Sequence, residues 1–336
     1  MDRSVVTDNI RTSAAEAPVV PRRRSRRDFS FDSISFFLVF LGVPLAVFVF
    51  LVIWPFIQAA YYSLTDWNGL TASMNFIGLD NFERLLNDDL FMKALGNSVL
   101  LLAVVPTLIL IIALTFATLI TVGGASKGQI RGLKGSSFYR VVSFFPYTIP
   151  GVAIGLLWAL VLLPNGGLVN SLLVELGFDG FAGFAWLGDK AAAMPVSIFI
   201  IMWGLIGFYM LLFIAAIKDV PAETYEAARL DGAGRFRTAI SITIPLIREN
   251  VQTAWIYLGI FALDAFAYMS VLNSTGGPEY STLVITQYLY RVAFNDFKFG
   301  YASAIGVFLA VITLLFAALV FSVNYLTGGG NRKAKR

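Results

Sequence analysis

Residues 221–245 read PAETYEAARLDGAGRFRTAISITIP and form a polar interval between two long apolar runs. Pro221 falls in the first turn of a predicted helix, where its missing N–H costs no hydrogen bond. Glu223 and Glu226 follow at the end of the helix where the dipole favours negative charge. Gly232 permits the left-handed backbone of a sharp reversal, which ends the helix. The interval therefore predicts a helix, a glycine turn and a second helix, which we call the elbow.

The second helix of the elbow is expected over about residues 235–243. Arg235 and Arg237 point outward in this interpretation, and Pro245 starts the chain toward the next apolar run. Three isoleucines are expected on the buried side of this helix: Ile240, Ile242 and Ile244. The product is a stiff projection, narrow enough to enter a cleft of another protein. The plainer alternative is an amphipathic loop that rests on a membrane surface.

Long apolar runs recur along the rest of the chain, which is 57% apolar and has a mean hydropathy of +0.75. A helix needs about 20 apolar residues to cross the hydrocarbon layer of a membrane. Six runs are long enough, at residues 35–60, 97–122, 140–163, 192–217, 251–274 and 300–326. The sequence therefore predicts an all-α polytopic membrane protein with six transmembrane helices.

Positive charge alternates between the connections of these spans. The amino-terminal tail, the connections 123–140 and 218–250 and the carboxyl tail hold 20 Lys and Arg residues, whereas the other three connections hold five. The positive-inside rule then places both termini and the elbow in the cytoplasm. Three regions follow: a basic disordered tail over 1–33, a six-span domain over 34–326 with its cytoplasmic loop at 218–250, and a basic tail over 327–336.

The chain contains no cysteine and no histidine. This composition excludes disulfides, thiol catalysis, Cys/His metal sites and histidine acid–base chemistry. The interval from Gly123 to Gly128 has the glycine spacing of a phosphate-binding loop, but Gln129 follows where that loop has lysine. We therefore expect a chain that is not an enzyme, with no catalytic residue, metal site or cofactor of its own.

The elbow resembles the EAA loop of bacterial ABC-importer permeases, through Glu226-Ala227-Ala228, Gly232 and Ile242-Thr243-Ile244-Pro245. The resemblance extends over about residues 34–326, through SLTDWN at 63–68, FIGLDNF at 76–82, FFPYTIP at 144–150 and GGP at 276–278. Together these motifs look like the carbohydrate-type permease subunits, related to the larger of the two maltose permease subunits. Both basic tails fall outside the resemblance.

This resemblance implies the type I ABC-importer permease fold in the cytoplasmic membrane of a bacterium. It also implies a second permease that shares the translocation path, a dimer of ATP-binding subunits that holds ATP and magnesium, and an extracytoplasmic solute-binding protein. The positions that carry over as the contact with the ATPase are Glu226, Ala227, Ala228 and Gly232, with Pro245 closing the motif.

Asp264 is the one acidic or basic residue inside the predicted spans, apart from Arg140 at a boundary. A carboxylate in hydrocarbon costs about 2.5–3.5 kcal/mol, so we expect it to face a wet cavity or a partner. Tyr268 lies one helical turn further along and shares the face of Asp264. The pair suits a sugar, because an aromatic ring covers C–H surfaces and a carboxylate accepts hydrogen bonds from hydroxyl groups. Tyr147 and Trp158 are further candidates for the substrate path. Other aromatic candidates are Trp203, Tyr209, Trp255 and Tyr257.

Each of these substrate-path candidates has an alternative role. Asp264 is equally suited to a polar contact with the sister permease, and the aromatic residues to interface anchoring or core packing. The sugar itself stays open among amino sugars or chito-oligosaccharides, other di- and oligosaccharides, and glycerol phosphates. In such systems specificity rests largely on the binding protein, which is a different chain.

Two other classes of protein are less consistent with the sequence. A stand-alone secondary transporter or channel is expected to have internal repeats and several ionisable residues within its spans. No clear repeat is visible, and Asp264 is a single such residue. A membrane enzyme would need catalytic partners that a chain without histidine or cysteine lacks.

Overall fold

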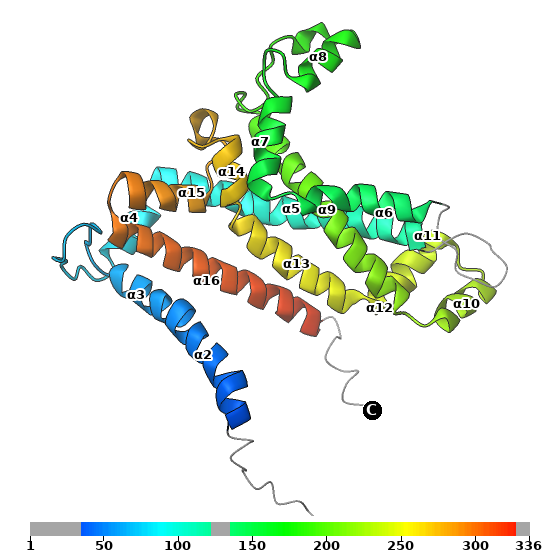
Figure 1. The fold of residues 1–336 in the computed structure, drawn as a ribbon, viewed down its shortest axis with the longest axis horizontal. Coiled ribbons are helices and arrows are strands. Elements are labelled where there is room, and N and C mark those ends of the chain that lie inside the picture. The colour runs from blue at the N-terminus through cyan, green and yellow to red at the C-terminus, as the bar shows by residue number, and fades with distance from the viewer. Residues whose placement is uncertain (1–34, 122–134, 327–336) are drawn as a thin grey trace, which may run out of the picture. The chain divides into compact units, whose positions relative to one another are not determined.

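The computed structural model describes residues 35–121 and 135–326, which fold into helices joined by loops (Figure 1). One isolated antiparallel bridge, Thr65 with Phe76, is found in this part of the chain. The predicted all-α class is therefore confirmed. The chain divides after Pro55 into two compact units. The predicted tails and the Gly123–Gly128 interval lie outside the described residues.

A continuous apolar helix runs from Ser35 to Tyr62 and begins in the first unit. It comprises η1 (Leu38–Gly42), α2 (Val43–Phe48), η2 (Val49–Ile53) and α3 (Trp54–Tyr62). Its two π-helical turns each come just before a proline, Pro44 and Pro55. A proline ring clashes with the carbonyl four residues earlier, and the wider turn relieves that clash. None of the residues in these four elements is buried, so this helix needs apolar surroundings.

The second unit holds the other helices. They are α4 (Asp80–Leu86), α5 (Asp89–Thr121), α6 (Ser136–Phe144), η3 (Phe145–Thr148), α7 (Gly151–Val161), α8 (Leu168–Glu175), η4 (Asp179–Phe181), α9 (Ala193–Lys218), α10 (Ala222–Leu230), α11 (Arg235–Thr238), η5 (Ala239–Thr243), α12 (Ile244–Leu246), α13 (Arg248–Leu263), α14 (Phe266–Leu272), η6 (Pro278–Tyr280), α15 (Ile285–Tyr290), η7 (Arg291–Asn295) and α16 (Phe299–Asn324). Helices α5, α9 and α13 pack together and bury Leu101, Phe213 and Leu258 between them. These three helices form the centre of the second unit.

The six predicted spans correspond to four unbroken helices and two bent pairs. The unbroken helices long and apolar enough to cross a membrane are Ser35–Tyr62, Asp89–Thr121, Ala193–Lys218 and Phe299–Val323. The second of these begins eight residues before the predicted start at position 97. The Asp88 carboxylate accepts the backbone N–H groups of Leu90 and Phe91 at 3.0 and 3.1 Å, which caps the helix at this earlier point.

The two bent pairs differ in the cause of their bends. Helices α6 and α7 meet at 98°. Between them lie a 3-10 turn that contains Pro146 and then Ile149, whose backbone is extended and which precedes Pro150. A proline cannot donate to the helical ladder and forces the preceding residue out of helical geometry, which accounts for this break. Helices α13 and α14 meet at 42°, where Asp264 leaves helical geometry at φ −102° and ψ 37°.

A polar cluster joins four helices at the end of the bundle where α5 begins. One oxygen of the Asp88 carboxylate accepts the hydroxyl of Tyr288 at 2.5 Å and that of Tyr301 at 2.8 Å. Arg84 lies over the Tyr301 ring, 4.6 Å from its centroid. Burial raises the pKa of Asp88, but these hydroxyls and the capping N–H groups outweigh it and hold the pKa below its ordinary value of 3.8. The cluster ties α4, α5, α15 and α16 together.

Helix α8 lies on an arm beyond α7, away from the central helices (Figure 1). The side chain of Asn170 holds this arm together: its amide donates to the carbonyls of Pro164 and Phe184 at 3.0 and 2.9 Å. The same side chain accepts the indole N–H of Trp186 at 2.6 Å. One buried amide therefore replaces the backbone ladder that this loop lacks.

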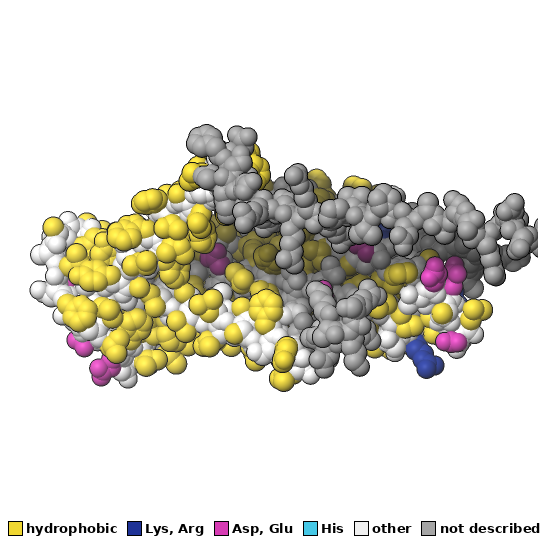
Figure 2. Space-filling model, turned by 90° about the horizontal axis from the view of Figure 1, so that it is seen from below, with side chains coloured by type: hydrophobic (Ala, Val, Ile, Leu, Met, Phe, Trp, Pro, Cys, Tyr) yellow, Lys and Arg dark blue, Asp and Glu magenta, His cyan; other side chains and the backbone are white. Residues whose placement is uncertain are grey.

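The surface of the chain is largely apolar. On the face in Figure 2, hydrophobic side chains far outnumber charged ones. Large apolar side chains such as Leu51, Leu157 and Leu314 are 72%, 49% and 70% exposed. Exposure of this extent is expected where lipid or another membrane helix replaces water.

Replacing Asp88 by Asn is expected to lower the unfolding free energy by about 2 kcal/mol at neutral pH, because hydrogen bonds to a charged acceptor are lost. A lowered folded-state pKa means that the contribution is complete above the ordinary value of 3.8 and is lost as the pH falls through the folded-state value. Thermal unfolding of both proteins against pH measures the difference. The control is Asp89→Asn, which removes a neighbouring charge but leaves the hydrogen bonds of the two tyrosine hydroxyls to Asp88 in place. Equal stability of wild type and Asp88→Asn at neutral pH would contradict this role.

Candidate functional site

The first arm of the elbow is α10, which ends in a hydrogen-bonded reversal at Gly232. The N–H of Gly232 donates to the carbonyl of Arg229 at 3.0 Å, and that of Ala233 donates to Ala228 at 2.9 Å. Together with the positive φ of Gly232, +74°, these bonds form a Schellman cap. The predicted glycine reversal is therefore confirmed. A Cβ on Gly232 would meet nothing within 4 Å, so glycine is required by the backbone angle and not by space.

The inner side of the elbow is anchored by Tyr225, which is 4% exposed and belongs to the apolar core of the central helices. Ala228, three residues further along, is 5% exposed. Burial raises the pKa of Tyr225, whose hydroxyl lies 3.5 Å from that of Thr243 on the second arm. The Thr243 hydroxyl also lies 3.2 Å from the carbonyl oxygen of Thr238, which accepts its hydrogen bond. The contact between Tyr225 and Thr243 joins the two arms of the elbow.

The outer side of the elbow is exposed and partly apolar. Glu226, Ala227 and Gly232 are exposed, whereas Ala228 is buried. Leu230 and Phe236 are 88% and 80% exposed, at either side of the reversal. Pro245 is exposed within α12. Of the predicted coupling positions, Ala228 is thus the one that faces inward.

The predicted buried side of the second arm is wrong at Ile240, which is 49% exposed. Ile242 and Ile244 are half-buried, and the buried residues are instead Thr238, Thr243 and Ile247. The reason is the π-helical turn η5, in which Thr243 lies five positions after Thr238 and one turn further along. A π-turn inserts an extra residue and rotates the face that follows, so a regular helical period misplaces it.

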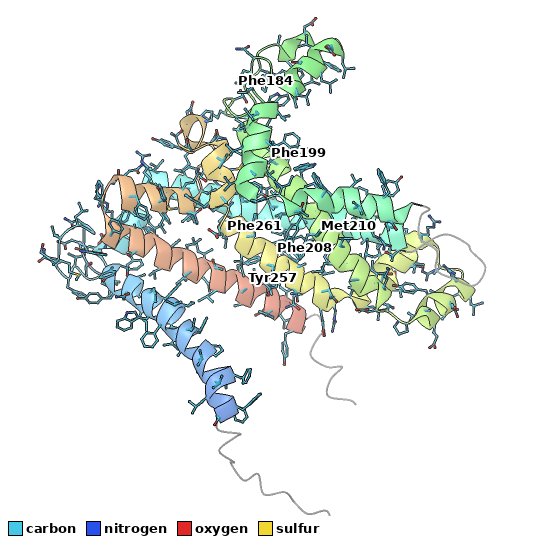
Figure 3. All side chains as sticks on the ribbon, viewed as in Figure 1. Phe184, Phe199, Phe208, Met210, Tyr257 and Phe261 are labelled. Carbon is cyan, nitrogen blue, oxygen red and sulfur yellow. The ribbon has the colours of Figure 1, made fainter. Side chains whose placement is uncertain are left out.

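An aromatic cavity of about 440 Å³ lies between η3, α9 and α13, with Phe208, Tyr257 and Phe261 visible in Figure 3. Its walls are Tyr147, Leu205, Phe208, Tyr209, Leu212, Thr253, Ala254, Tyr257 and Phe261. The rings of Tyr147 and Phe208 stack with centroids 4.5 Å apart and an interplanar angle of 18°. The cavity therefore offers aromatic faces with a few hydroxyl groups at their edges.

A close approach of α6 and α9 sets the position of this stacked pair. A Cβ on Gly207 would lie 1.8 Å from the carbonyl oxygen of Ser143, so only glycine allows the two backbones to come this near. Tyr147 follows Ser143 by one turn, and Phe208 follows Gly207 directly. The contact at Gly207 thus brings the two rings together.

The four predicted substrate-path residues do not all reach the cavity. Tyr147 lines it, but Asp264, Tyr268 and Trp158 are absent from its walls. Tyr268 is 5% exposed and packs on Gly151 and Gly204, and its ring lies 5.9 Å from that of Phe261. The ring of Trp158 packs edge-on against Phe199 and Trp203, at 5.3 and 5.6 Å.

The shared face predicted for Asp264 and Tyr268 is also wrong. Asp264 is exposed, whereas Tyr268 is buried against α7 and α9. The helix breaks between them, at Asp264 and Ala265, so the spacing of one regular turn no longer applies. The carboxylate of Asp264 faces the surroundings of this chain.

Two aromatic residues of the cavity were not among the sequence candidates, namely Phe208 and Phe261. The chain holds 30 phenylalanines, and no spacing distinguishes these two from the rest. The one available signal is Gly207 next to Phe208, because a glycine inside an apolar helix indicates a close helix contact.

Residues 120–327 match the family of binding-protein-dependent transport system inner membrane components. The chain is 58% identical to the diacetylchitobiose uptake system permease protein of Streptomyces coelicolor, over 94% of this chain and 89% of that protein. It is 31% identical to the multiple sugar-binding transport system permease protein of Streptococcus mutans, over 85% of this chain and 93% of that protein.

A solved structure has a similar fold. In the crystal structure of a bacterial alginate ABC transporter in complex with an alginate pentasaccharide-bound periplasmic protein, one chain superposes with a TM-score of 0.74. The two chains are 22% identical, and the match covers 88% of this chain and 97% of that one. The similarity extends over nearly the whole described chain.

The chain belongs to the family of inner-membrane components of binding-protein-dependent transport systems, the permease subunits of ABC importers. The predicted resemblance to its carbohydrate-type members is confirmed.

Replacing Gly207 by Ala is expected to separate α6 from α9 and to destabilise the protein by about 3 kcal/mol, because the new methyl group meets backbone that cannot rotate away. Thermal unfolding in detergent measures the loss. The matched control is Gly96→Ala, an exposed helical glycine whose Cβ would meet nothing within 4 Å. A Gly207→Ala protein as stable as the control would show that the close contact does not hold the helices.

Proposed function

We propose that this chain is one of two permease subunits of an ATP-driven importer for chito-oligosaccharides, with diacetylchitobiose as the expected substrate. The 58% identity to a diacetylchitobiose uptake permease over 94% of the chain supports this substrate. Amino sugars of this class present apolar C–H faces and amide groups. The cavity, with stacked rings and tyrosine hydroxyls, offers groups that match both.

The observation that carries the coupling role is the construction of the elbow. Its outer side exposes Glu226, Ala227 and Leu230 on a helix that is capped at Gly232 and anchored by Tyr225. A small, stiff helix with an exposed apolar edge is suited to enter a cleft of an ATPase subunit. The chain supplies no nucleotide-binding motif of its own, so ATP and magnesium belong to that partner.

The mechanism follows from how the elbow joins the cavity. Helix α9 leads into the first arm of the elbow, and the second arm leads back into α13. These two helices supply eight of the nine wall residues, and Tyr147 is the ninth. Movement of the elbow by an ATPase would therefore shift two walls of the cavity, which is what a switch between inward- and outward-facing states requires.

The remaining partners are a second permease and an extracytoplasmic solute-binding protein. The cavity is partly open to the outside of this chain, so we expect the second permease to complete the path. Asp264, exposed at the bend of the fifth span, is suited to face either that subunit or the path. Both termini and the elbow are expected in the cytoplasm, from the positions of Lys and Arg.

Replacing Gly232 by Pro is expected to abolish uptake and sugar-stimulated ATPase activity, while membrane insertion stays intact. Proline fixes φ near −65° and lacks the N–H that bonds to Arg229, so the cap cannot form. The matched variant is Gly232→Asn, which tolerates the left-handed backbone and should retain most activity. Uptake assays and ATPase assays on the assembled importer decide the matter, and wild-type transport by Gly232→Pro would refute the coupling role.

Replacing Tyr257 by Ala is expected to reduce uptake of labelled diacetylchitobiose at low concentration by about two- to ten-fold, the worth of one aromatic contact. Tyr139→Ala is the control, because Tyr139 is an exposed tyrosine outside the cavity. Competition by unlabelled maltose and diacetylchitobiose tests the substrate class. Stronger competition by maltose would contradict the proposed substrate, and sugar movement by this chain without its ATPase would favour a stand-alone transporter.

A further inference from the structure

A second groove, of about 400 Å³, lies between the last turns of α5 and the second arm of the elbow. Helix α5 contributes Ile111, Leu114, Thr115, Thr118 and Leu119, and the elbow contributes Arg235, Phe236, Ala239, Ile240 and Ile244. The groove is separate from the aromatic cavity and shares no wall residue with it. Its size is within the range of small-molecule sites in proteins.

The two threonine hydroxyls of this groove are already satisfied within α5. The Thr115 hydroxyl donates to the carbonyl of Ile111 at 2.7 Å, and the Thr118 hydroxyl donates to that of Thr115 at 2.9 Å. Both threonines therefore have no free donor for a sugar. The groove suits a hydrocarbon chain, because what remains along its length is apolar.

One positive charge lies at the edge of this apolar surface. Arg235 is exposed in the first turn of α11 and lines the groove. Arg235 forms no ion pair with any carboxylate of residues 35–121 and 135–326. The neighbouring apolar side chains stay exposed, with Phe236 at 80% and Ile240 at 49%.

The groove also lies in the carboxyl-terminal half of the predicted span 97–122. Its residues on α5 begin at Ile111, ten residues before the end of the helix at Thr121. Ten helical residues rise about 15 Å, which is half of the hydrocarbon thickness of about 30 Å. A chain in this groove would run from the middle of the bilayer to the surface where Arg235 lies.

We propose that this groove binds an anionic phospholipid of the cytoplasmic leaflet, with one acyl chain along α5 and the phosphate beside Arg235. The assignment to the cytoplasmic leaflet rests on the orientation proposed above. The position of Arg235 at the edge of an apolar groove does not depend on that orientation. Basic pockets at the cytoplasmic ends of membrane helices favour anionic headgroups. Such a lipid contacts both α5 and the elbow, and so braces the segment that receives the motion of the ATPase.

The test uses the assembled importer in nanodiscs of phosphatidylcholine, with a small share of phosphatidylglycerol that carries a photoreactive group on its acyl chain. We expect the label on the α5 peptide that contains residues 111–119. Arg235→Gln should lower this labelling about five-fold, the effect of one basic side chain near an anionic surface. Arg237→Gln is the matched control, since Arg237 is exposed on the same helix but does not line the groove.

A second pair of variants tests the apolar part of the groove. Ala239→Trp fills it and should remove the label, whereas Ser241→Trp adds the same ring at an exposed position outside it. Gel filtration of each complex verifies assembly. The proposal also predicts that phosphatidylglycerol carrying an unmodified chain competes for the label better than phosphatidylcholine does.

Three results would overturn the proposal. Equal losses for Arg235→Gln and Arg237→Gln would mean general attraction to the membrane surface. Equal competition by the two lipids would remove the role of the headgroup. A photoreactive residue at position 240 that captures the second permease, with no lipid label on α5, would make the groove a subunit interface. Labelling is measured without sugar or ATP. The lipid result therefore does not depend on whether the proposed transport function is correct.

Discussion

The close packing of helices at the glycines of α9 is the constraint on which the rest of the second unit depends. Gly207 lets the backbone of α6 approach α9, and Gly204 receives the hydroxyl end of Tyr268 from α14. Both bent spans are therefore fixed against one straight helix. In a membrane the hydrophobic effect does not drive helices together, so contacts that small residues permit carry the packing energy. The cavity follows from this arrangement, because its walls belong to α9 and to the two bent spans that pack on it.

The same helix connects the cavity to the elbow. Helix α9 ends at Lys218, three residues before Pro221, and α13 begins two residues after α12 ends. The elbow is thus a rigid link between two walls of the cavity, and its cap at Gly232 keeps that link stiff. At the other end of the bundle, Asp88 holds α5, α15 and α16 through two tyrosine hydroxyls. One end of the bundle is fastened by charge-assisted hydrogen bonds, while the elbow end has exposed apolar residues.

The helical class, the number of spans and the reversal at Gly232 could be predicted because each depends on local properties. Span length follows from the run of apolar residues, and the reversal follows from the backbone freedom of glycine. The predictions failed where a helix departs from regular geometry. Ile240 was misplaced by a π-turn, and the pairing of Asp264 with Tyr268 was lost at a bend that contains no proline. A periodic pattern assumes a constant rotation per residue, and neither irregularity leaves a mark in the composition.

The sequence by itself determined what the chain is made of: apolar spans, a polar interval with a glycine cap, and a charge distribution that predicts orientation. Only the tertiary structure decided which aromatic residues share a cavity. Tyr147, Phe208 and Tyr257 come from three segments that are far apart in the chain, and Trp158 and Tyr268, which are equally aromatic, pack elsewhere. The physical reason is that side chains meet across helices according to bends and backbone distances, which arise from the packing of all the spans together.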